Sequence, residues 1–385
     1  MVDTRQPQDL RTDTTGGENF LEECRRVWRD PHLPFRHALI LVGALAVAVS
    51  VGLRFYCPSA LWLDETISVN IAKLPLIQIP TALSHDGAPP LYYVLLHFWM
   101  MVFGRGDVAA RALSGLLSVA TLPFFWQAGR RVGGRLTGWV VFFLALTSPF
   151  AIQYAATARM YSLMILLSVL GFLTLEHALE APTRRHLVEL GIVTALILYT
   201  HYWGVYLVVA AGAWLLYRMF REHRAGVPDL LALRPALRAM LIGSLFFLPW
   251  SPIFVFQTLH TGTPWTGAAG PADLIGVFGD FSGGGPWGRL LGDLYLVFLV
   301  LGLFGRPALR AGVRSPATDG GPTPLVTLVT RPNRRLAGLT GVLIGTLLLA
   351  VVAGAVANAA FIDRYTAVAL PLFLLVVGVG ITVLT

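Results

Sequence analysis

The sequence predicts an all-α integral membrane protein, built as a bundle of about ten transmembrane helices. Of its 385 residues, 55% are hydrophobic and 13% are charged, whereas a soluble domain usually has about 25% charged residues. The apolar residues form blocks close to the roughly 20 residues that cross a bilayer as a helix. Arginines gather between these blocks and explain the net charge of +8. A soluble enzyme and a nucleic-acid-binding protein are therefore excluded.

The first apolar block, Ala38–Tyr56, follows the arginine-rich segment "RRVWRDPHLPFRH". Because basic residues favour the cytoplasmic side, we expect the N-terminus in the cytoplasm. Residues 1–36 lack the apolar stretch and cleavage site of a signal peptide, so we interpret them as a cytoplasmic tail. Residues 37–385 then form one transmembrane domain in the bacterial cytoplasmic membrane. Cys24 and Cys57 flank the first span, which excludes a disulfide between them and a cysteine metal site.

Nine further apolar blocks continue the bundle. They are Ala112–Gln127, Leu136–Phe150, Met160–Leu179, Leu187–Trp203, Val205–Met219, Ala236–Phe256, Leu290–Phe304, Leu336–Ala357 and Val368–Leu384. Leu91–Gly104 is also apolar but is short for a span. If it lies in the membrane interface, every later basic loop faces the cytoplasm, as the positive-inside rule requires. We therefore expect residues 57–108 to form a large first extracytoplasmic loop with interfacial helices.

Two adjacent carboxylates, Asp64 and Glu65, follow the first span in "LWLDETISVN". One interpretation makes Asp64 the N-cap of a helix, with Glu65 favourable near the positive helix end. The other makes Asp64 a general base at the membrane surface, where it deprotonates a hydroxyl group. The two interpretations are compatible.

Further along the same loop, His85 and Asp86 precede the prolines of "SHDGAPPLYY". They are either turn residues or ligands, His85 for a phosphate and Asp86, together with Asp64, for a metal ion. No spacing of three or more ligands supports a metal site, so no metal ligand is assigned. A divalent metal ion stays an open option as cofactor.

Polar residues also gather at the expected outer ends of later spans. Arg159 and Tyr161 in "QYAATARMYSL", and Arg364 and Tyr365 in "FIDRYTAVALP", either reach to lipid headgroups or bind the phosphate of a lipid carrier. Aromatic residues at the same level belong to an interfacial belt or form walls for a sugar. These residues are His201, Tyr202, Trp203 and Trp265.

In this order, "LDE", "PPLYYVLLHFW", "ARMYSL" and "RY…LP" resemble the GT-C membrane glycosyltransferases. The most similar branch is the glycosyltransferase 39 or dolichyl-phosphate-mannose mannosyltransferase-like group, which includes bacterial polyprenyl-phosphate-sugar transferases. The resemblance extends from Leu61 to Pro371. It implies a GT-C-type bundle and transfer of a sugar, mannose or similar, from a polyprenyl-phosphate donor to a glycan, lipid or protein hydroxyl outside the membrane, with inversion.

Residue roles follow from the resemblance. Asp64 is expected to be the catalytic base and Glu65 to bind the acceptor. The donor phosphate and sugar would contact His85, Arg159, Tyr161, Arg364 and Tyr365.

Two features depart from the family pattern. Residues are inserted between His85 and the prolines, and Thr157 stands where many members have a glutamate. A transporter or lipid-carrier flippase without glycosyl transfer is the main alternative, and a catalytically silent relative is another. Membrane lipids are expected partners in each case, and nucleic acids are not.

Overall fold

The computed structural model describes residues 33–226, 230–260, 269–305, 308–311, 326–329, 334–357 and 361–383. The chain divides into two compact units, Met1–Val49 and Ser50–Thr385. Helix α2, Leu33–Leu53, begins in the first unit and ends in the second. Most of the predicted cytoplasmic tail, and Trp265 further along, lie outside the described residues. All other candidate site residues belong to the second unit, which is the subject of the following paragraphs.

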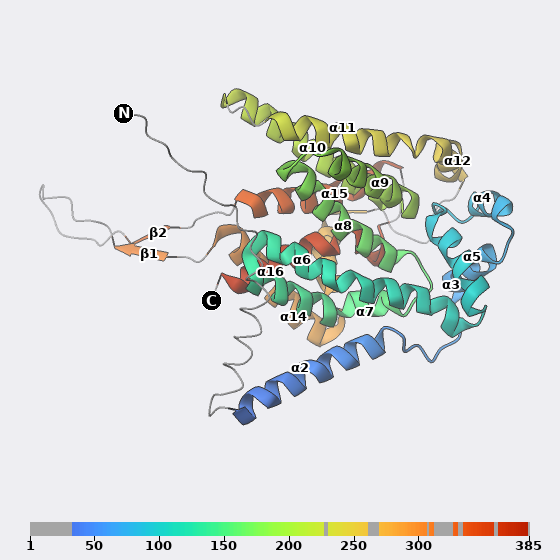
Figure 1. Cartoon of the computed structure of the whole chain (residues 1–385), viewed down its shortest axis with the longest axis horizontal. Coiled ribbons are helices and arrows are strands. Elements are labelled where there is room, and N and C mark those ends of the chain that lie inside the picture. Colours follow the sequence, from blue (N-terminus) through green and yellow to red (C-terminus); the bar gives the residue numbers. More distant parts are fainter. Residues whose placement is uncertain are drawn as a thin grey trace, which may run out of the picture. The chain divides into compact units, whose positions relative to one another are not determined.

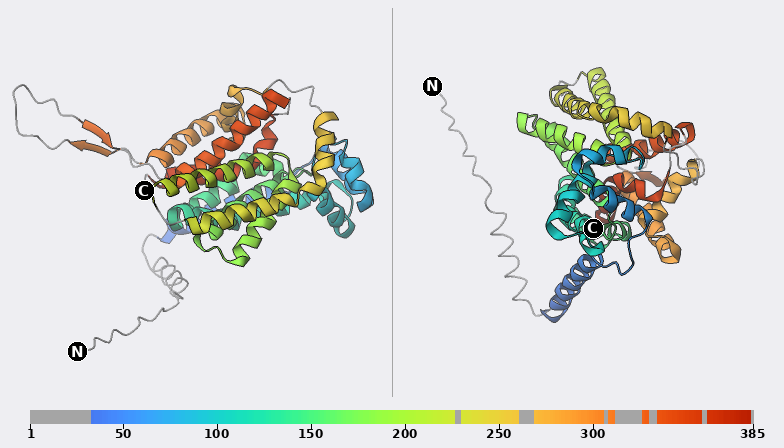
Figure 2. Two further views of the ribbon diagram at one scale, coloured as in Figure 1. Left: turned by 90° about the horizontal axis from the view of Figure 1, so that it is seen from above. Right: turned by 90° about the vertical axis from the view of Figure 1, so that its right-hand side faces the viewer.

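The segment after α2 forms short helices grouped at one end of the helix bundle (Figures 1 and 2). They are α3 (Leu63–Ala72), a 3₁₀ turn at Leu76–Gln78, α4 (Ile79–Leu83) and α5 (Leu91–Phe103). Tyr92, Tyr93, Leu96 and Met100 form the buried face of α5, whereas Met101 and Val102 are exposed. One buried face on a short apolar helix suits the predicted interfacial position, which stays a prediction.

The remaining helices, most of them longer, build the bundle itself (Figure 1). In chain order they are α6 (Asp107–Thr147), α7 (Pro149–Ala155), α8 (Tyr161–Glu180), α9 (Arg184–Thr200), α10 (Trp203–Arg224), α11 (Leu230–Leu245), α12 (Ser251–His260), α13 (Pro271–Phe281), α14 (Gly285–Phe304), α15 (Arg334–Ala357) and α16 (Leu370–Thr382). Short 3₁₀ turns at Leu248–Trp250 and Asp363–Val368 precede α12 and α16.

Helix α6 consists of two arms that turn at Gly134, whose φ of 87° is readily reached by glycine alone. The arms pack closely, since a Cβ on Gly129 would lie 2.8 Å from the carbonyl oxygen of Thr137. This hairpin confirms the two separate blocks predicted at Ala112–Gln127 and Leu136–Phe150.

By length and composition, six helices in the described part of the chain can cross a membrane, and the two-armed α6 counts once among them. Three shorter apolar helices accompany them: His37–Leu53, Leu91–Phe103 and Leu370–Thr382. The helical membrane fold is therefore confirmed, whereas the number of ten spans is not.

Two elements were not foreseen. Helix α13 lies between the blocks predicted at Ala236–Phe256 and Leu290–Phe304. A short antiparallel pair, β1 (Ala308–Ala311) and β2 (Val326–Val329), lies between the blocks predicted at Leu290–Phe304 and Leu336–Ala357.

Helix α16 is the centre of the bundle, with every residue from Leu370 to Gly380 buried. Glycines allow its neighbours to approach closely. A Cβ on Gly380 would overlap the carbonyl oxygen of Phe298, and one on Gly302 would lie 2.6 Å from that of Val376. Small residues at helix contacts are typical of packing within membranes. This rigid centre supports the turn at Asp363–Val368 and, with it, Arg364 and Tyr365.

Candidate active site

Helix α3 begins after Trp62, and Glu65 is the residue that caps it. The Oε2 atom of Glu65 accepts a hydrogen bond of 3.2 Å from the backbone N–H of Trp62, as a carboxylate at the third helical position does in a capping box. Asp64 stands at the second position and is not the N-cap. The capping interpretation of Asp64 was therefore wrong, and its carboxylate is left for other contacts.

Glu65 has no exposed surface and forms a two-bond ion pair with Arg111 of α6. Arg111 Nε lies 2.8 Å from Oε1 and Nη2 lies 2.5 Å from Oε2. The backbone N–H of Ala158 donates to the same Oε1 at 2.7 Å. Arg111 also donates to the carbonyl oxygens of Ser59 and Ala60. The expected role of Glu65 in acceptor binding does not agree with this position, because both carboxylate oxygens are bonded and covered.

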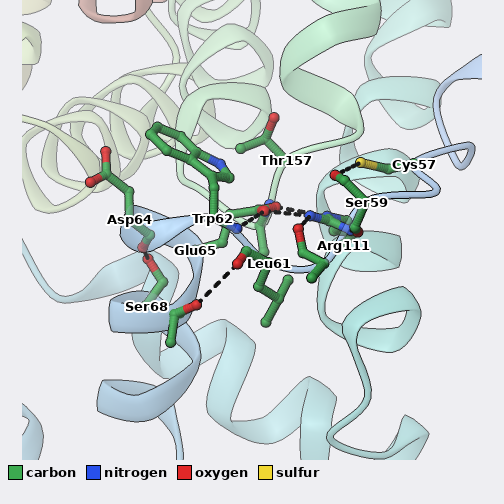
Figure 3. Close-up of polar contacts among 12 residues, drawn as sticks. Cys57, Ser59, Leu61, Trp62, Asp64, Glu65, Ser68, Arg111 and Thr157 are labelled. Atoms are coloured by element: carbon green, nitrogen blue, oxygen red, sulfur yellow. Dashed lines mark hydrogen bonds and ion pairs between the residues drawn. The ribbon is translucent and has the colours of Figure 1, made fainter.

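The Asp64 side chain points away from this ion pair (Figure 3). Its Oδ2 lies 3.1 Å from Nη2 of Arg364, and its side chain keeps 23% of its surface exposed. The guanidinium of Arg364 lies over the ring of Trp62, 5.4 Å from the centroid. Among the described residues, Nε of Arg364 is buried and has no hydrogen-bond partner. Asp64 is thus accessible to solvent. Its partner, Arg364, still has an Nε–H group that donates to no described residue.

Arg159 contacts the same helix from the loop before α8. Its Nη1 donates to Ser68 Oγ at 3.0 Å and to the backbone oxygen of Asp64 at 3.4 Å. The same nitrogen lies 3.3 Å from Tyr93 OH and 3.8 Å from Oδ2 of Asp86. Nε of Arg159 is buried and unbonded within the described part of the chain. Two arginines from distant segments, Arg159 and Arg364, therefore meet at Asp64.

Asp86, and not His85, is the residue of its loop that enters this cluster. Gly87, with a φ of 75°, turns the chain there, and Tyr93 donates a hydrogen bond to the Asp86 carboxylate. Burial raises the pKa of Asp86 and outweighs the opposing effects of Arg159 and the Tyr93 hydrogen bond. His85 is exposed and its ring lies edge-on to Phe256. The expected contact between His85 and the donor phosphate does not agree with this position.

Aromatic side chains close the cluster on another side. The ring of Tyr365 lies 4.7 Å from that of His201, which in turn lies 6.2 Å from Tyr161. The hydroxyl of Tyr161 is buried and, within the described residues, has no hydrogen-bond partner. Burial, with Arg159 and Arg364 nearby, lowers the pKa of His201 to about 3, so this side chain is neutral at physiological pH.

The two aromatic residues that follow His201 in the chain point toward different parts of the structure. Trp203 packs against Phe361 and Tyr365, beside the cluster. Tyr202 instead accepts a hydrogen bond from Trp250 and contacts Gln257, so it does not join the expected aromatic wall.

Charge and unused donors together define what the site can bind. Two arginines, two carboxylates and a neutral histidine are mutual neighbours. Three buried donors, Nε of Arg159, Nε of Arg364 and the hydroxyl of Tyr161, have no partner among the described residues. Buried donors are normally bonded, so such atoms at one place indicate a missing acceptor group. An anion with several oxygens, such as a phosphate, fits this set. No group of three potential metal ligands occurs in the described part of the chain.

Several partners in this site were missed in the sequence. Arg111, Ser68 and Tyr93 were not assigned roles, and the ion pair between Asp86 and Arg159 was not foreseen. One signal could have found Arg111, since a charged residue at the start of an apolar block requires a partner. Ser68 and Tyr93 follow the helical spacing of α3 and α5 and are indistinguishable there from packing residues.

Comparisons with known proteins agree with the fold described above. The family model of dolichyl-phosphate-mannose-protein mannosyltransferases matches residues 87–252. No curated protein matches the sequence. The fold is similar to that of ArnT from Cupriavidus metallidurans bound to undecaprenyl phosphate, with a TM-score of 0.58 at 13% identity, over 92% of this chain and 61% of that one. The apo form of the same protein matches with a TM-score of 0.56 at 14% identity, over 90% and 60% of the two chains.

The chain thus spans about three fifths of the length of the ArnT structures that it matches. The matched segment includes Arg111 and Arg159 but begins after Asp64. The chain has the GT-C fold of ArnT, and residues 87–252 carry the sequence pattern of the dolichyl-phosphate-mannose-protein mannosyltransferase family.

Proposed function

We propose that this protein is a GT-C membrane glycosyltransferase that moves a sugar from a polyprenyl-phosphate carrier to a hydroxyl acceptor. The fold and the family match support a glycosyltransferase of this class. The proposed donor class is supported by the similarity to ArnT, of which one structure holds undecaprenyl phosphate. Mannose or a similar sugar, a glycan, lipid or protein acceptor, and an active site on the extracytoplasmic face are parts of the same proposal.

One observation supports the donor site above all others. Arg159 and Arg364 both contact Asp64, and each keeps a buried Nε–H without a partner in the described residues. A phosphate between them would accept these hydrogen bonds and the one from Tyr161. Tyr365 then lies beside the carrier or the sugar. The charged donors are in place before the ligand arrives, which is the arrangement that stabilises a leaving phosphate.

Asp64 is the general base of the proposed reaction. The acceptor oxygen forms a bond to the anomeric carbon, while the bond from that carbon to the phosphate oxygen breaks. The proton of the acceptor hydroxyl passes to the Asp64 carboxylate, and the electron pair leaves with the carrier phosphate. Attack opposite the leaving group inverts the anomeric centre. A positioned base of this kind contributes roughly 10²–10⁴-fold to the rate.

Glu65 acts in this proposal by holding its neighbours in place. Its carboxylate joins Arg111, the start of α3 and the amide of Ala158, which precedes Arg159. It therefore fixes the distance between the helix that presents Asp64 and the loop that presents Arg159. His85 has no role in the proposed reaction, because its ring lies against Phe256.

Sugar transfer in membranes that contain the full chain tests the proposal. Wild type, Asp64→Asn and the exposed-site control Asp293→Asn are incubated with radiolabelled polyprenyl-phosphate mannose, glucose or arabinose. We expect transfer by wild type and control, and none by Asp64→Asn at an equal amount of folded protein. Activity of Asp64→Asn near that of wild type would show that Asp64 is not the general base. No transfer by any of the three proteins would favour the transporter or the silent relative.

A further inference from the structure

A cavity lies within the bundle, away from Asp64. Its volume is about 570 Å³, within the range of typical ligand sites. Helices α8, α9, α10, α11 and α15 supply most of its walls. The residues of the proposed donor site, Arg159, Tyr161 and Arg364, are absent from its lining. The proposed sugar transfer therefore does not involve this cavity.

The walls are apolar over most of their length, as a hydrocarbon chain requires. Phe172, Leu207, Met240 and Val342 are representative of the lining. Two hydroxyl groups interrupt these walls. That of Thr194 donates to the backbone oxygen of Leu190, whereas that of Ser168 is buried and has no hydrogen-bond partner in the described residues. The interior thus offers apolar surface and one unused hydroxyl, but no charge.

Charged residues gather at one end of the cavity. Glu176, Glu180, Arg218 and Arg221 come from the C-terminal ends of α8 and α10. Helix α8 starts at Tyr161, inside the proposed active site, and ends at Glu180. At 1.5 Å per residue the two ends are about 28 Å apart. The polar end therefore lies across the membrane-spanning bundle from Asp64.

The charges at this end differ in how they are paired. Glu180 is bonded to Arg131 at 2.7 Å, and Arg218 to Glu222 at 2.8 Å. Arg221 is exposed on the cavity lining, one helical turn beyond Tyr217 and two turns beyond Trp214, two aromatic residues in contact with each other. Aromatic and basic side chains at the end of a span match the headgroup level of a bilayer. An arginine fork there is suited to a phosphate group.

We propose that this cavity binds one membrane phospholipid, with its phosphate beside Arg221 and Arg218 and an acyl chain along the apolar walls toward Ser168. Arg221 and Arg218 at the polar end bind the phosphate, and the apolar interior selects a hydrocarbon chain. The lipid enters from the leaflet opposite the catalytic cluster and stabilises the packing of α8 against α10 and α15. This inference does not rest on the proposed sugar transfer.

Native mass spectrometry of the purified, delipidated full chain in detergent tests the inference, with phosphatidylglycerol as the probe. We expect wild type to retain one lipid tightly. Arg221→Glu replaces the attractive charge by a repulsive one and should weaken retention by about tenfold or more. Arg224→Glu is the matched control: it lies on the same helix end and is equally exposed, but it does not line the cavity. Retention by Arg224→Glu should equal that of wild type.

A second pair of variants tests the interior. Ala211→Phe fills the cavity from α10 and should abolish retention, whereas Leu216→Phe on the exposed face of the same helix should not. Equal retention by Arg221→Glu and Arg224→Glu would overturn the proposal, whether or not Ala211→Phe folds. Displacement of phosphatidylglycerol by polyprenyl phosphate at lower concentration would also overturn it and would assign the cavity to the carrier lipid.

Discussion

The buried ion pair between Glu65 and Arg111 joins three parts of the chain that meet at the candidate active site. Its two charged hydrogen bonds link α3 to α6, and the same carboxylate holds the amide of Ala158. Both side chains are almost fully covered. Each buried charge is therefore stable in this position only because the other charge pairs with it.

Removal of one partner should destabilise the fold strongly. We expect Arg111→Met to lower the free energy of unfolding by about 3–5 kcal/mol, because Glu65 is then a buried and unpaired charge. Glu65→Gln combined with Arg111→Met removes both charges and should recover part of the loss. Thermal unfolding in detergent measures both variants. Arg185→Ala, which breaks the exposed pair with Glu189, serves as the control and should leave the stability almost unchanged. A similar loss in Arg111→Met and Arg185→Ala would contradict the prediction.

The arginines that contact Asp64 should affect catalysis more than stability. Arg364→Lys keeps the charge but loses the planar fork, so we expect kcat/KM for sugar transfer to fall by roughly 10²-fold or more. Arg159→Lys should have a comparable effect through the same phosphate. Arg289→Lys is the control, since Arg289 is exposed on α14. If Arg364→Lys and Arg289→Lys gave equal rates, Arg364 would not contact the leaving group.

His201 should not titrate between pH 5 and pH 8. Burial, with two nearby arginines, lowers its pKa to about 3, so the ring is neutral both at pH 5 and at pH 8. Replacement by Asn can change the rate through lost packing against Tyr365, but the shape of the pH profile of kcat/KM should stay the same. A limb between pH 5 and 8 that is present in wild type and lost in His201→Asn would refute the neutral state.

Asp280 of α13 should make stability depend on pH. Burial raises its pKa to about 6, with added repulsion from Asp363 and Asp273. The folded state therefore binds this proton more tightly than the unfolded state, so stability falls as pH rises from about 4 to about 6 and stays lower above.

Asp280→Asn removes that penalty. We expect a higher melting temperature than wild type at pH 8 and no gain at pH 4, measured in the same detergent. Asp293→Asn, at an exposed position on α14, should show no such difference between the two pH values. A gain for Asp280→Asn of equal size at both pH values would contradict an electrostatic origin.

The helical membrane fold could be predicted from the sequence because hydropathy depends on composition over about twenty residues and hardly on context. Short elements were harder. Helix α13 is 11 residues long and glycine-containing, so its segment has the composition of a loop. The count of ten spans is not confirmed, since length alone does not decide whether α16 crosses the membrane: it has 13 residues and is buried by its neighbours along most of its length.

The candidate site was predicted in part. Asp64, Arg159, Tyr161, Arg364 and Tyr365 are brought together by the fold, although their roles stay proposals. Glu65 and His85 were placed in the right segments, but adjacent residues on a helix or turn point in different directions. The side chains of Asp64 and Glu65 therefore point in different directions (Figure 3). Pairs such as Glu65 with Arg111 depend on tertiary packing, which no local pattern in the sequence records.

The side chain of Gln257 has a consequence for exchanging segments between this protein and its relatives. From α12 it donates to the carbonyl oxygens of Leu83 and Ala88, at the two ends of the turn that presents Asp86. The length of that turn is therefore matched to a helix 174 residues further along the chain than Leu83. A chimaera that imports a shorter turn here from a protein of similar fold should place its carboxylate correctly only when the corresponding helix is imported with it.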